Sequence, residues 1–322
     1  METRCKKASF PGSVVYSNNH NQVLRRNISS PSVAGKRSVI LIVFDSVSHS
    51  NFIRSMPKSL QLLQQLYKSY VFEGMSKVGD QSFPNAVAFL AGTPQFALNW
   101  HTELGHDYMN QINVADDDFA DFLTRHFEAL KDSFLFILSD HGHRFDSIRR
   151  TAVGRIEERF PFFSMHIPDD IRKRYPAVHH RIEANTKDRN CKEAGIPDEL
   201  CMCHMENAVD VARPEIRLLA KELIGHLNNV LAPHKRCAKL ELSKILHASV
   251  FDNDDRRDEI QHYRLTAEAR PSLALFEAVL KYDRATNSSL VYGNVNRINP
   301  YGNQSDCVFE QELRKFCYCV AS

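Results

Sequence analysis

The chain has 322 residues, 43% of them hydrophobic, and its formal net charge is +2. This length and composition allow one large domain or two ordinary ones with hydrophobic cores. A nearly neutral charge gives no reason to expect a nucleic acid or a membrane surface as a partner, and no apolar run approaches the roughly 18 residues of a membrane span.

Residues 1–36 are polar and show no sustained period, so the sequence predicts a flexible N-terminal segment there. The first predicted strand, Lys36–Phe44, is apolar on both faces, as buried parallel strands are. Asp45 follows it directly and therefore lies at the carboxyl end of the strand. An alternative role for Asp45 is to cap the next helix.

A polar loop that contains Ser82 comes next, after a predicted helix over Met56–Tyr70 and a predicted short strand over Tyr70–Met75. A helix is expected over Ala86–Gly92. A hydroxyl just before a helix is most often an N-cap. It is also a place where a nucleophile would benefit from the positive end and free N–H groups of the helix.

Two further elements precede the centre of the chain. Phe96–Thr102 is predicted to be a strand that leads to His106, and Asp116–Ala129 is predicted to be an amphipathic helix with an acidic first turn.

The apolar run Phe134–Leu138 predicts a buried strand, and Asp140, His141 and Gly142 follow it. Open α/β sheets bind their ligands at the carboxyl ends of parallel strands. A carboxylate and an imidazole are donors that a metal such as zinc accepts, and a glycine lets the backbone turn closely around a ligand. The alternative is a strand-end turn with a capping aspartate and a surface histidine.

The composition changes after about Lys187, where apolar runs shorten and cysteines become frequent. Before this point Pro161–Ile167 is another predicted strand, and beyond it Pro214–Leu231 is a predicted helix that begins with proline. We expect an α/β core over 37–185, with a mainly parallel sheet flanked by helices. A smaller cysteine-containing α+β part is expected over 186–322.

Seven of the eight cysteines lie after residue 190, and four of these form two C-x-C pairs. This spacing predicts disulfides rather than a zinc module, although eight cysteines allow 105 pairings. Glycosylation sequons at Asn27, Asn287 and Asn303 agree with secretion. The sequence therefore predicts an extracellular or lumenal glycoprotein, although its first residues lack the apolar region of a secretory signal.

The order of these elements resembles the alkaline-phosphatase-like superfamily, which includes phosphatases and sulfatases. Longer segments resemble the sulfatase-like invertebrate family DUF229. The segments that carry this resemblance are SVILIVFDSVSHSNFIRSMPKS, KVGDQSFPN, HTELGHD, LSDHGHRFDSIRRTAVGRIEERFPFFS, NCKEAGIPDELCMC and INPYGNQSDC…FCYC.

The resemblance implies that Asp45, Ser82, Asp140 and His141 bind one divalent metal, zinc or manganese, with Ser82 as the catalytic nucleophile. The substrate-binding residues that it implies are Asn85, His106, His143 and Arg144. His106 could instead belong to a second metal site, and His143 and Arg144 could instead form salt bridges with Glu157 and Glu158.

The chain also departs from the family that it resembles. Members usually have a long segment before the strand at Phe96 and another after Asn185, and the latter brings a histidine that completes a two-metal site. Neither His179 nor His180 has a comparable context, so a second metal site is doubtful. The formylglycine signature of sulfatases is absent around Ser82, which argues against sulfate-ester hydrolysis by that route.

The sequence thus predicts a metal-dependent hydrolase or transferase of phosphate-type esters in the secretory pathway or extracellular space, with activity retained, reduced or lost. Its substrate would be a small-molecule or glycan-linked anionic ester. The alternatives are a non-catalytic extracellular binding protein and an incomplete gene model. Enzyme status, the identity of the substrate and the oligomeric state stay open at this point.

Overall fold

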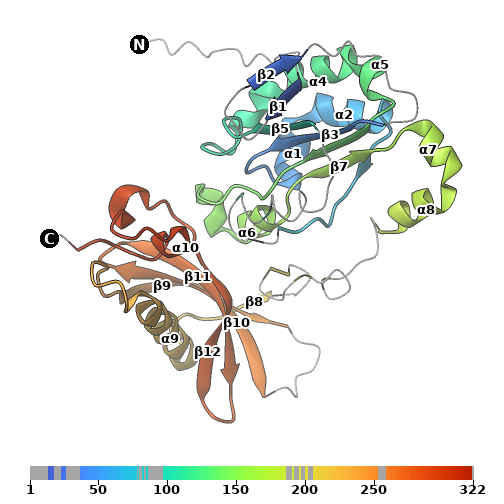
Figure 1. The fold of residues 1–322 in the computed structure, drawn as a ribbon. Helices are drawn as coiled ribbons and strands as arrows, with labels where there is room; N and C mark the ends of the chain where they lie inside the picture. The colour runs from blue at the N-terminus through green and yellow to red at the C-terminus, as the bar shows by residue number, and fades with distance from the viewer. Residues whose placement is uncertain are drawn as a thin grey trace. The chain divides into compact units, whose positions relative to one another are not determined.

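The structure is a computed structural model that describes residues 14–17, 23–26, 37–77, 79, 82, 85, 97–185, 191, 196, 200–201, 206–252 and 259–320. The chain divides into two compact units, Met1–Ile196 and Pro197–Ser322, which we call unit 1 and unit 2. Unit 1 runs from blue to yellow-green in Figure 1, and unit 2 runs from yellow to red. Each unit is described by itself below.

Unit 1 contains a five-stranded sheet with the strand order β4-β7-β6-β3-β5. Strand β3 is parallel to both of its neighbours, β6 and β5, and only β7 is reversed, because it pairs antiparallel with β6 and with β4. The predicted mainly parallel sheet is therefore confirmed. The strands are β3 (Val39–Phe44), β4 (Tyr70–Val71), β5 (Ala97–His101), β6 (Phe134–Leu138) and β7 (Phe163–His166).

Two expected helices of unit 1 have other bounds in the structure: the one expected over Met56–Tyr70 covers Pro57–Gln65, and the one expected over Asp116–Ala129 is divided. Residues 116–129 form two helices because His126, with φ −101° and ψ 7°, leaves the helical region between them. The helix expected over Ala86–Gly92 lies outside the described residues. The helices are α1 (His49–Ser55), α2 (Pro57–Gln65), α4 (Asp116–Arg125), α5 (Phe127–Leu130), α6 (Ala152–Arg159), α7 (Asp169–Arg174) and α8 (Pro176–Asn185), with 3₁₀ turns η1 (Gln111–Ala115) and η2 (Ser147–Arg150).

Both faces of β3 are buried. Ile42 and Phe44 belong to the main core, which also includes Phe52 of α1 and Phe119 of α4, whereas Val43 belongs to a small cluster with other strand residues. Each fully buried Phe or Ile contributes about 1.5–3 kcal/mol. This burial on both faces explains why the strand reads as a continuous apolar run in the sequence.

The N-terminal segment, which the sequence predicts to be flexible, contains two short strands. These are β1 (Val14–Ser17) and β2 (Val23–Arg26), and they pair antiparallel. Each strand is a short run that includes valine in an otherwise polar segment, so composition over the whole segment conceals it.

Unit 2 is an antiparallel sheet with the order β12-β11-β10-β9-β8, and α9 packs against it. The helix has the predicted bounds, Pro214–Leu231, and buries Leu219, Leu223 and Leu227 at helical spacing. The remaining elements are β8 (Glu206–Ala208), β9 (Glu241–Phe251), β10 (Ile260–Arg270), β11 (Ala274–Asp283), β12 (Ser288–Arg297), η3 (Gly302–Ser305) and α10 (Gln311–Arg314).

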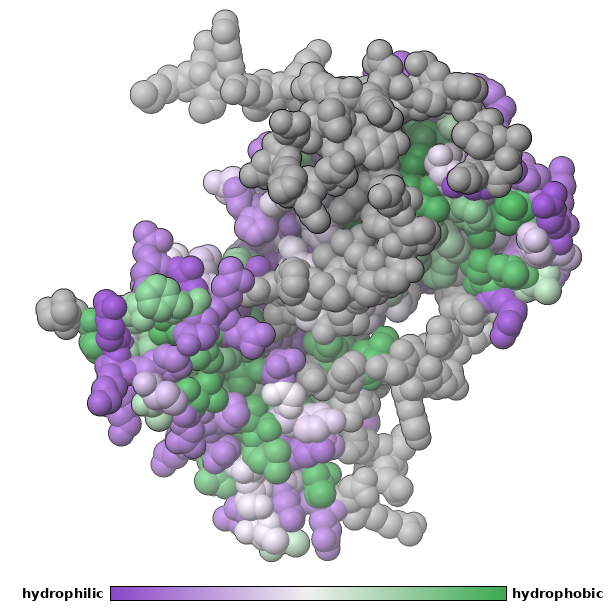
Figure 2. All heavy atoms as spheres, in the orientation of Figure 1, coloured by the Kyte–Doolittle hydropathy of each residue, from purple (hydrophilic) through white to green (hydrophobic). Residues whose placement is uncertain are grey.

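Hydrophilic and hydrophobic residues are interspersed over the visible surface of unit 2 (Figure 2). Within the described ranges, no helix combines the length and the apolar character that a bilayer span requires.

One disulfide ties the C-terminal segment of unit 2 to the connection between α9 and β9, and a second closes a loop within that segment. Cys237 bonds Cys317, and Cys307 bonds Cys319, so the two cysteines of one C-x-C pair have different partners. The Sγ atoms of Cys307 and Cys317 are 3.4 Å apart, so the two disulfides lie against each other. Cys191 and Cys201 are disulfide-bonded as well. The predicted disulfides are therefore confirmed, and such bonds are typical of oxidising compartments.

Candidate functional site

Two acidic residues lie side by side at the carboxyl ends of β3 and β6. The strands are parallel neighbours with Val43 opposite Leu138, so Asp45 and Asp140 follow the strand ends at matched positions. Both carboxylates and the ring of His141 are buried, with exposed fractions of 3%, 1% and 0%. Each of the three offers a ligand atom, and these atoms all lie within 4.8 Å of one another.

Two atoms of this cluster fit a bound cation. Asp140 Oδ2 and His141 Nε2 are buried, lie 3.4 Å apart, and have no hydrogen-bond partner among the described residues. An unpaired buried polar atom costs about 1–3 kcal/mol, and a cation would remove that cost. Carboxylate oxygen and imidazole nitrogen are suitable ligands for zinc or manganese.

The other polar atoms of Asp140 and His141 are already engaged, and they fix the orientation of both side chains. Asp140 Oδ1 accepts from the backbone N–H groups of Ser46 (3.1 Å) and His141 (2.9 Å). His141 Nδ1 donates to the carbonyl of Gly142 at 2.9 Å, which leaves Nε2 with its lone pair. Burial lowers the pKa of His141 below its usual 6.5 and outweighs the neighbouring Asp140, which raises it; the charges of Arg144 and Lys77 lower it further. The ring is therefore neutral at pH 7, as a metal ligand must be.

Ser82 lies beside the first aspartate. Its hydroxyl donates to Asp45 Oδ2 at 3.1 Å, so the structure brings together all four residues implied as metal ligands. Trp100 Nε1, from β5, donates to the same oxygen at 3.1 Å, and Ser46 Oγ donates to Asp45 Oδ1 at 2.8 Å.

Sequence reasoning missed Trp100 and Ser46. The signal for Trp100 was its place in a strand that pairs with β3, where it lies opposite Val43. Ser46 has φ 63°, in the left-handed region that residues other than glycine rarely adopt. This conformation directs its backbone N–H to Asp140, and such local strain is common at functional sites.

Glu157 of α6 holds the segment that follows Asp45. It accepts two hydrogen bonds from Arg54 of α1, at 2.7 and 2.9 Å, and one from Ser48 Oγ at 3.1 Å. Ser48 is also the N-cap of α1, since its Oγ accepts from the N–H of Asn51.

Glu158, the next residue of α6, holds two further segments. Its carboxylate pairs with Lys77, which precedes the Ser82 loop, and the two side chains are 2% and 1% exposed. Its backbone carbonyl accepts from Gly142 N–H at 2.9 Å, and Arg149 lies 3.4 Å from its other oxygen. The three segments that carry the cluster thus converge on two adjacent residues of α6.

Gly142 is required by this packing. A Cβ atom at this position would lie 2.2 Å from the carbonyl oxygen of Glu157 and 2.7 Å from the Cα atom of Glu158, closer than such contacts occur in proteins. The glycine therefore allows the Asp140–His141 turn to approach the backbone of α6.

The structure also places the four residues implied in substrate binding. Asn85 makes two hydrogen bonds to the backbone of Gly79, so its amide holds the loop that contains Ser82. Arg144 is half-buried with its guanidinium 4.8 Å from the Phe145 ring, and it has no carboxylate partner among the described residues. The alternative ion pairs of His143 and Arg144 are wrong, because Arg54, Lys77 and Arg149 take those places on Glu157 and Glu158.

His143 and His106 lie near each other. Burial lowers the pKa of His143, and the charge of His106 lowers it further, whereas Asp146 raises it. His143 Nδ1 accepts from the N–H of Asp146 at 3.1 Å, and backbone carbonyls of Asp107 and His106 lie close enough to the ring to raise its pKa slightly. His106 is exposed, with Nδ1 2.9 Å from Asp107.

In the described part of the chain, no third side chain completes a second metal site with His143 and His106. The one other group of potential ligands is formed by Cys237, Cys307 and Cys317, and all three are disulfide-bonded. His179 and His180 lie on α8, where His179 contacts Tyr70 and Glu183.

Comparison with solved structures finds similarity to a protein of the alkaline phosphatase superfamily from Vibrio parahaemolyticus. The identity is 10%, the match covers 81% of this chain and 83% of the other, and the TM-score is 0.34. A search of curated proteins finds no match. A family profile, described as a protein of unknown function (DUF229), matches residues 1–95, 92–188 and 182–246. Consecutive matches overlap at 92–95 and at 182–188, the two places where the resemblance implies missing segments. Together the matches cover residues 1–246 of the 322. The chain therefore belongs to the DUF229 family.

Proposed function

We propose that unit 1 is a metal-dependent hydrolase or transferase that acts on phosphate-type esters, with Ser82 as its nucleophile. The observation that carries this proposal is the buried group of Asp45, Asp140 and His141, with the Ser82 hydroxyl hydrogen-bonded to it. A hydroxyl, two carboxylates and an imidazole at the carboxyl ends of parallel strands form the arrangement that metal-assisted ester cleavage needs.

Asp45, Asp140 and His141 would hold one divalent cation, and zinc or manganese matches these donors. A cation bound there would lower the pKa of a coordinated hydroxyl and polarise a phosphoryl oxygen.

The residues of the chain then have separate tasks. Asp45 Oδ2 holds the hydroxyl proton of Ser82, which orients the nucleophilic oxygen. The Arg144 guanidinium offers a planar set of donors to an anionic ester group, and its charge is close enough to affect His141. His143 lies close enough to the exposed His106 for the two charges to interact, and we assign His143 a contact with the substrate.

The substrate class follows from the charge of these contacts. An anionic ester of a small molecule or of a glycan suits the exposed His106 and Arg144, which has no carboxylate partner in the part of the chain that the structure describes. The disulfides of unit 2 support a location in the secretory pathway or outside the cell.

The test uses the full chain loaded with zinc or manganese and an aryl phosphate monoester and diester. We expect turnover by the wild-type protein and none by Ser82→Ala. Asp140→Asn is expected to lower the metal content measured by elemental analysis. Ser76→Ala, a nearby hydroxyl that contacts the Lys77 carbonyl, is the matched control and should leave the rate unchanged. Equal rates for wild type and Ser82→Ala would refute the proposal.

A second candidate is a non-catalytic extracellular binding protein. It is supported by the breaks in the family matches at 92–95 and 182–188, which agree with the loss of substrate-binding segments. An intact fold that binds neither zinc nor manganese would favour this candidate.

A further inference from the structure

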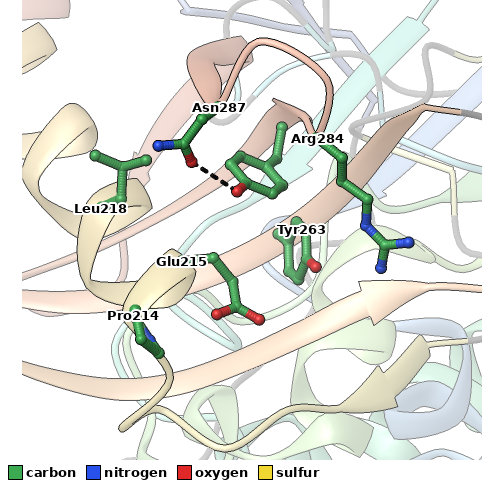
Figure 3. A pocket seen from close by; sticks show the side chains of 7 residues that line it. Pro214, Glu215, Leu218, Tyr263, Arg284 and Asn287 are labelled. Carbon is green, nitrogen blue, oxygen red and sulfur yellow. Dashed lines mark hydrogen bonds between the residues drawn. The ribbon is translucent and has the colours of Figure 1, made fainter.

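Unit 2 contains a pocket between the start of α9 and the turn that joins β11 to β12 (Figure 3). Its volume is about 440 Å³, within the roughly 300–1,000 Å³ of small-ligand sites. Leu218, Tyr263 and Tyr282 supply apolar and aromatic surface, and Glu215 and Arg284 supply charged groups. The pocket therefore offers an aromatic surface together with hydrogen-bonding groups.

Asn287 lies on the rim of this pocket and begins the sequence Asn287-Ser288-Ser289, an N-glycosylation sequon. It is exposed, it precedes β12 directly, and its φ is 51°. An acceptor at an exposed turn has room for a branched glycan outside the fold.

The side chain of Asn287 is oriented by the pocket. Tyr282 Oη donates to Asn287 Oδ1 at 2.8 Å, which fixes the plane of the amide. Figure 3 shows the amide nitrogen on the other side of the group, directed toward Leu218. Asp283 Oδ1 accepts from the backbone N–H groups of Ala285 (2.8 Å) and Thr286 (3.3 Å), so the turn itself is fixed.

The chemistry of the pocket suits a sugar ring. The apolar face of a pyranose packs on an aromatic side chain, and its hydroxyl and acetamide groups need donors and acceptors. Arg284 offers donors and Glu215 offers acceptors, and the two charges are of opposite sign. Glu215 also pairs with Arg213 at 3.0 Å. A neutral polyhydroxylated ligand therefore fits better than an ion.

The sequon at Asn303 lacks these features. Asn303 lies in η3, and the hydroxyl-bearing residue of its sequon, Ser305, is fully buried. The sequon at Asn27 lies outside the described residues.

We propose that Asn287 is N-glycosylated and that the first sugar of its glycan occupies this pocket, against Leu218 and Tyr282. The glycan comes from a lipid-linked oligosaccharide pyrophosphate. Asn287 Nδ2 forms a bond to the anomeric carbon, and the bond from that carbon to the pyrophosphate oxygen breaks. The lipid pyrophosphate leaves with the electron pair and takes up the proton that Nδ2 loses. This inference depends on the lumenal location proposed above and not on the activity of unit 1.

The first experiment maps the modification. The full chain is expressed behind a secretion signal in eukaryotic cells that attach high-mannose glycans, in an Asn27→Gln, Asn303→Gln background. Peptide mass spectrometry is expected to find a glycan on Asn287, and Ser289→Ala is expected to abolish it while leaving the asparagine in place. A secreted, disulfide-bonded protein with an unmodified Asn287 would overturn the proposal.

The second experiment tests the pocket. Endoglycosidase H leaves one sugar on the asparagine, and this trimmed protein is compared with the Ser289→Ala protein, which never carries a sugar. We expect the trimmed unit 2 to unfold at a temperature about 2–4 °C higher. Leu218→Ala should remove this difference, because it removes one wall of the pocket. If the trimmed protein and the Ser289→Ala protein unfold at the same temperature even with Leu218 in place, the sugar does not occupy the pocket. Neither readout depends on the activity of unit 1.

Discussion

The site of unit 1 and the C-terminal segment of unit 2 are both held to their cores by contacts between residues distant in sequence, but by different means. In unit 1, the buried carboxylates of Glu157 and Glu158 pair with basic side chains from other segments. In unit 2, the disulfide Cys237–Cys317 holds the C-terminal segment, and the adjacent disulfide Cys307–Cys319 closes a loop within it. The ion pairs of unit 1 place charged and hydrogen-bonding groups around the site. The disulfides of unit 2 add stability but no polar groups. The difference suits the proposal that unit 1 carries a catalytic site, since such a site needs charged and hydrogen-bonding groups around it.

The largest expected effect tests the ionic side of this comparison. Glu158→Ala removes the buried partner of Lys77 and Arg149, and we expect unit 1 to lose about 3–5 kcal/mol of stability. The only tryptophan of the chain, Trp100, lies in unit 1, so its fluorescence during urea unfolding reports this unit. Glu128→Ala breaks an exposed pair with Lys131 and serves as the control, and it is expected to leave the unfolding midpoint nearly unchanged because solvent screens the pair. Equal losses in the two variants would contradict a structural role for the buried pair.

A smaller effect is expected on the covalent side. The double variant Cys307→Ser, Cys319→Ser opens one disulfide and keeps the one between Cys237 and Cys317. We expect unit 2 to lose about 2–4 kcal/mol, measured by hydrogen exchange of the amides in β9–β12. The midpoint of the urea unfolding transition that Trp100 fluorescence reports for unit 1 should not change. A shift of that transition without a change in unit 2 would show that the disulfide stabilises the chain in another way.

The smallest expected effect concerns pH. Burial lowers the pKa of His101 below its usual 6.5, so the unfolded state binds a proton more readily than the folded state. Stability conferred by the neutral ring is therefore present above pH 6.5 and decreases as the pH falls through 6.5 toward the lower folded pKa. The slope from one such group cannot exceed about 1.4 kcal/mol per pH unit.

The control for this prediction keeps the packing and removes the titration. The His101 ring stacks on Phe44 with centroids 5.4 Å apart, so His101→Phe preserves an aromatic contact. We expect the stability of this variant, measured from the Trp100 unfolding transition, to depend less on pH between 5 and 6.5 than the stability of the wild-type protein. An unchanged pH dependence would mean that His101 does not contribute to it.

Much of the fold could be predicted because the informative signals are local. Continuous apolar runs predicted β3 and β6, and proline followed by a helical apolar period predicted α9. The same strands brought Asp45 and Asp140 together, because parallel neighbours end at the same edge of a sheet.

The rest depends on tertiary packing that no local pattern encodes. The pairing of Lys77 with Glu158 joins residues from separate segments, and nothing in either segment identifies the other. The same holds for the hydrogen bond from Trp100 to Asp45 and for the choice of disulfide partners among many possible pairings.

The parallel pairing of β3 with β6 has a kinetic consequence. A cation can be chelated by Asp45, Asp140 and His141 only after these two strands have met across the long intervening chain. Chelation therefore comes after the slow, entropically opposed step of strand association. A bound cation should then prolong the lifetime of the native state while leaving the rate of refolding nearly constant.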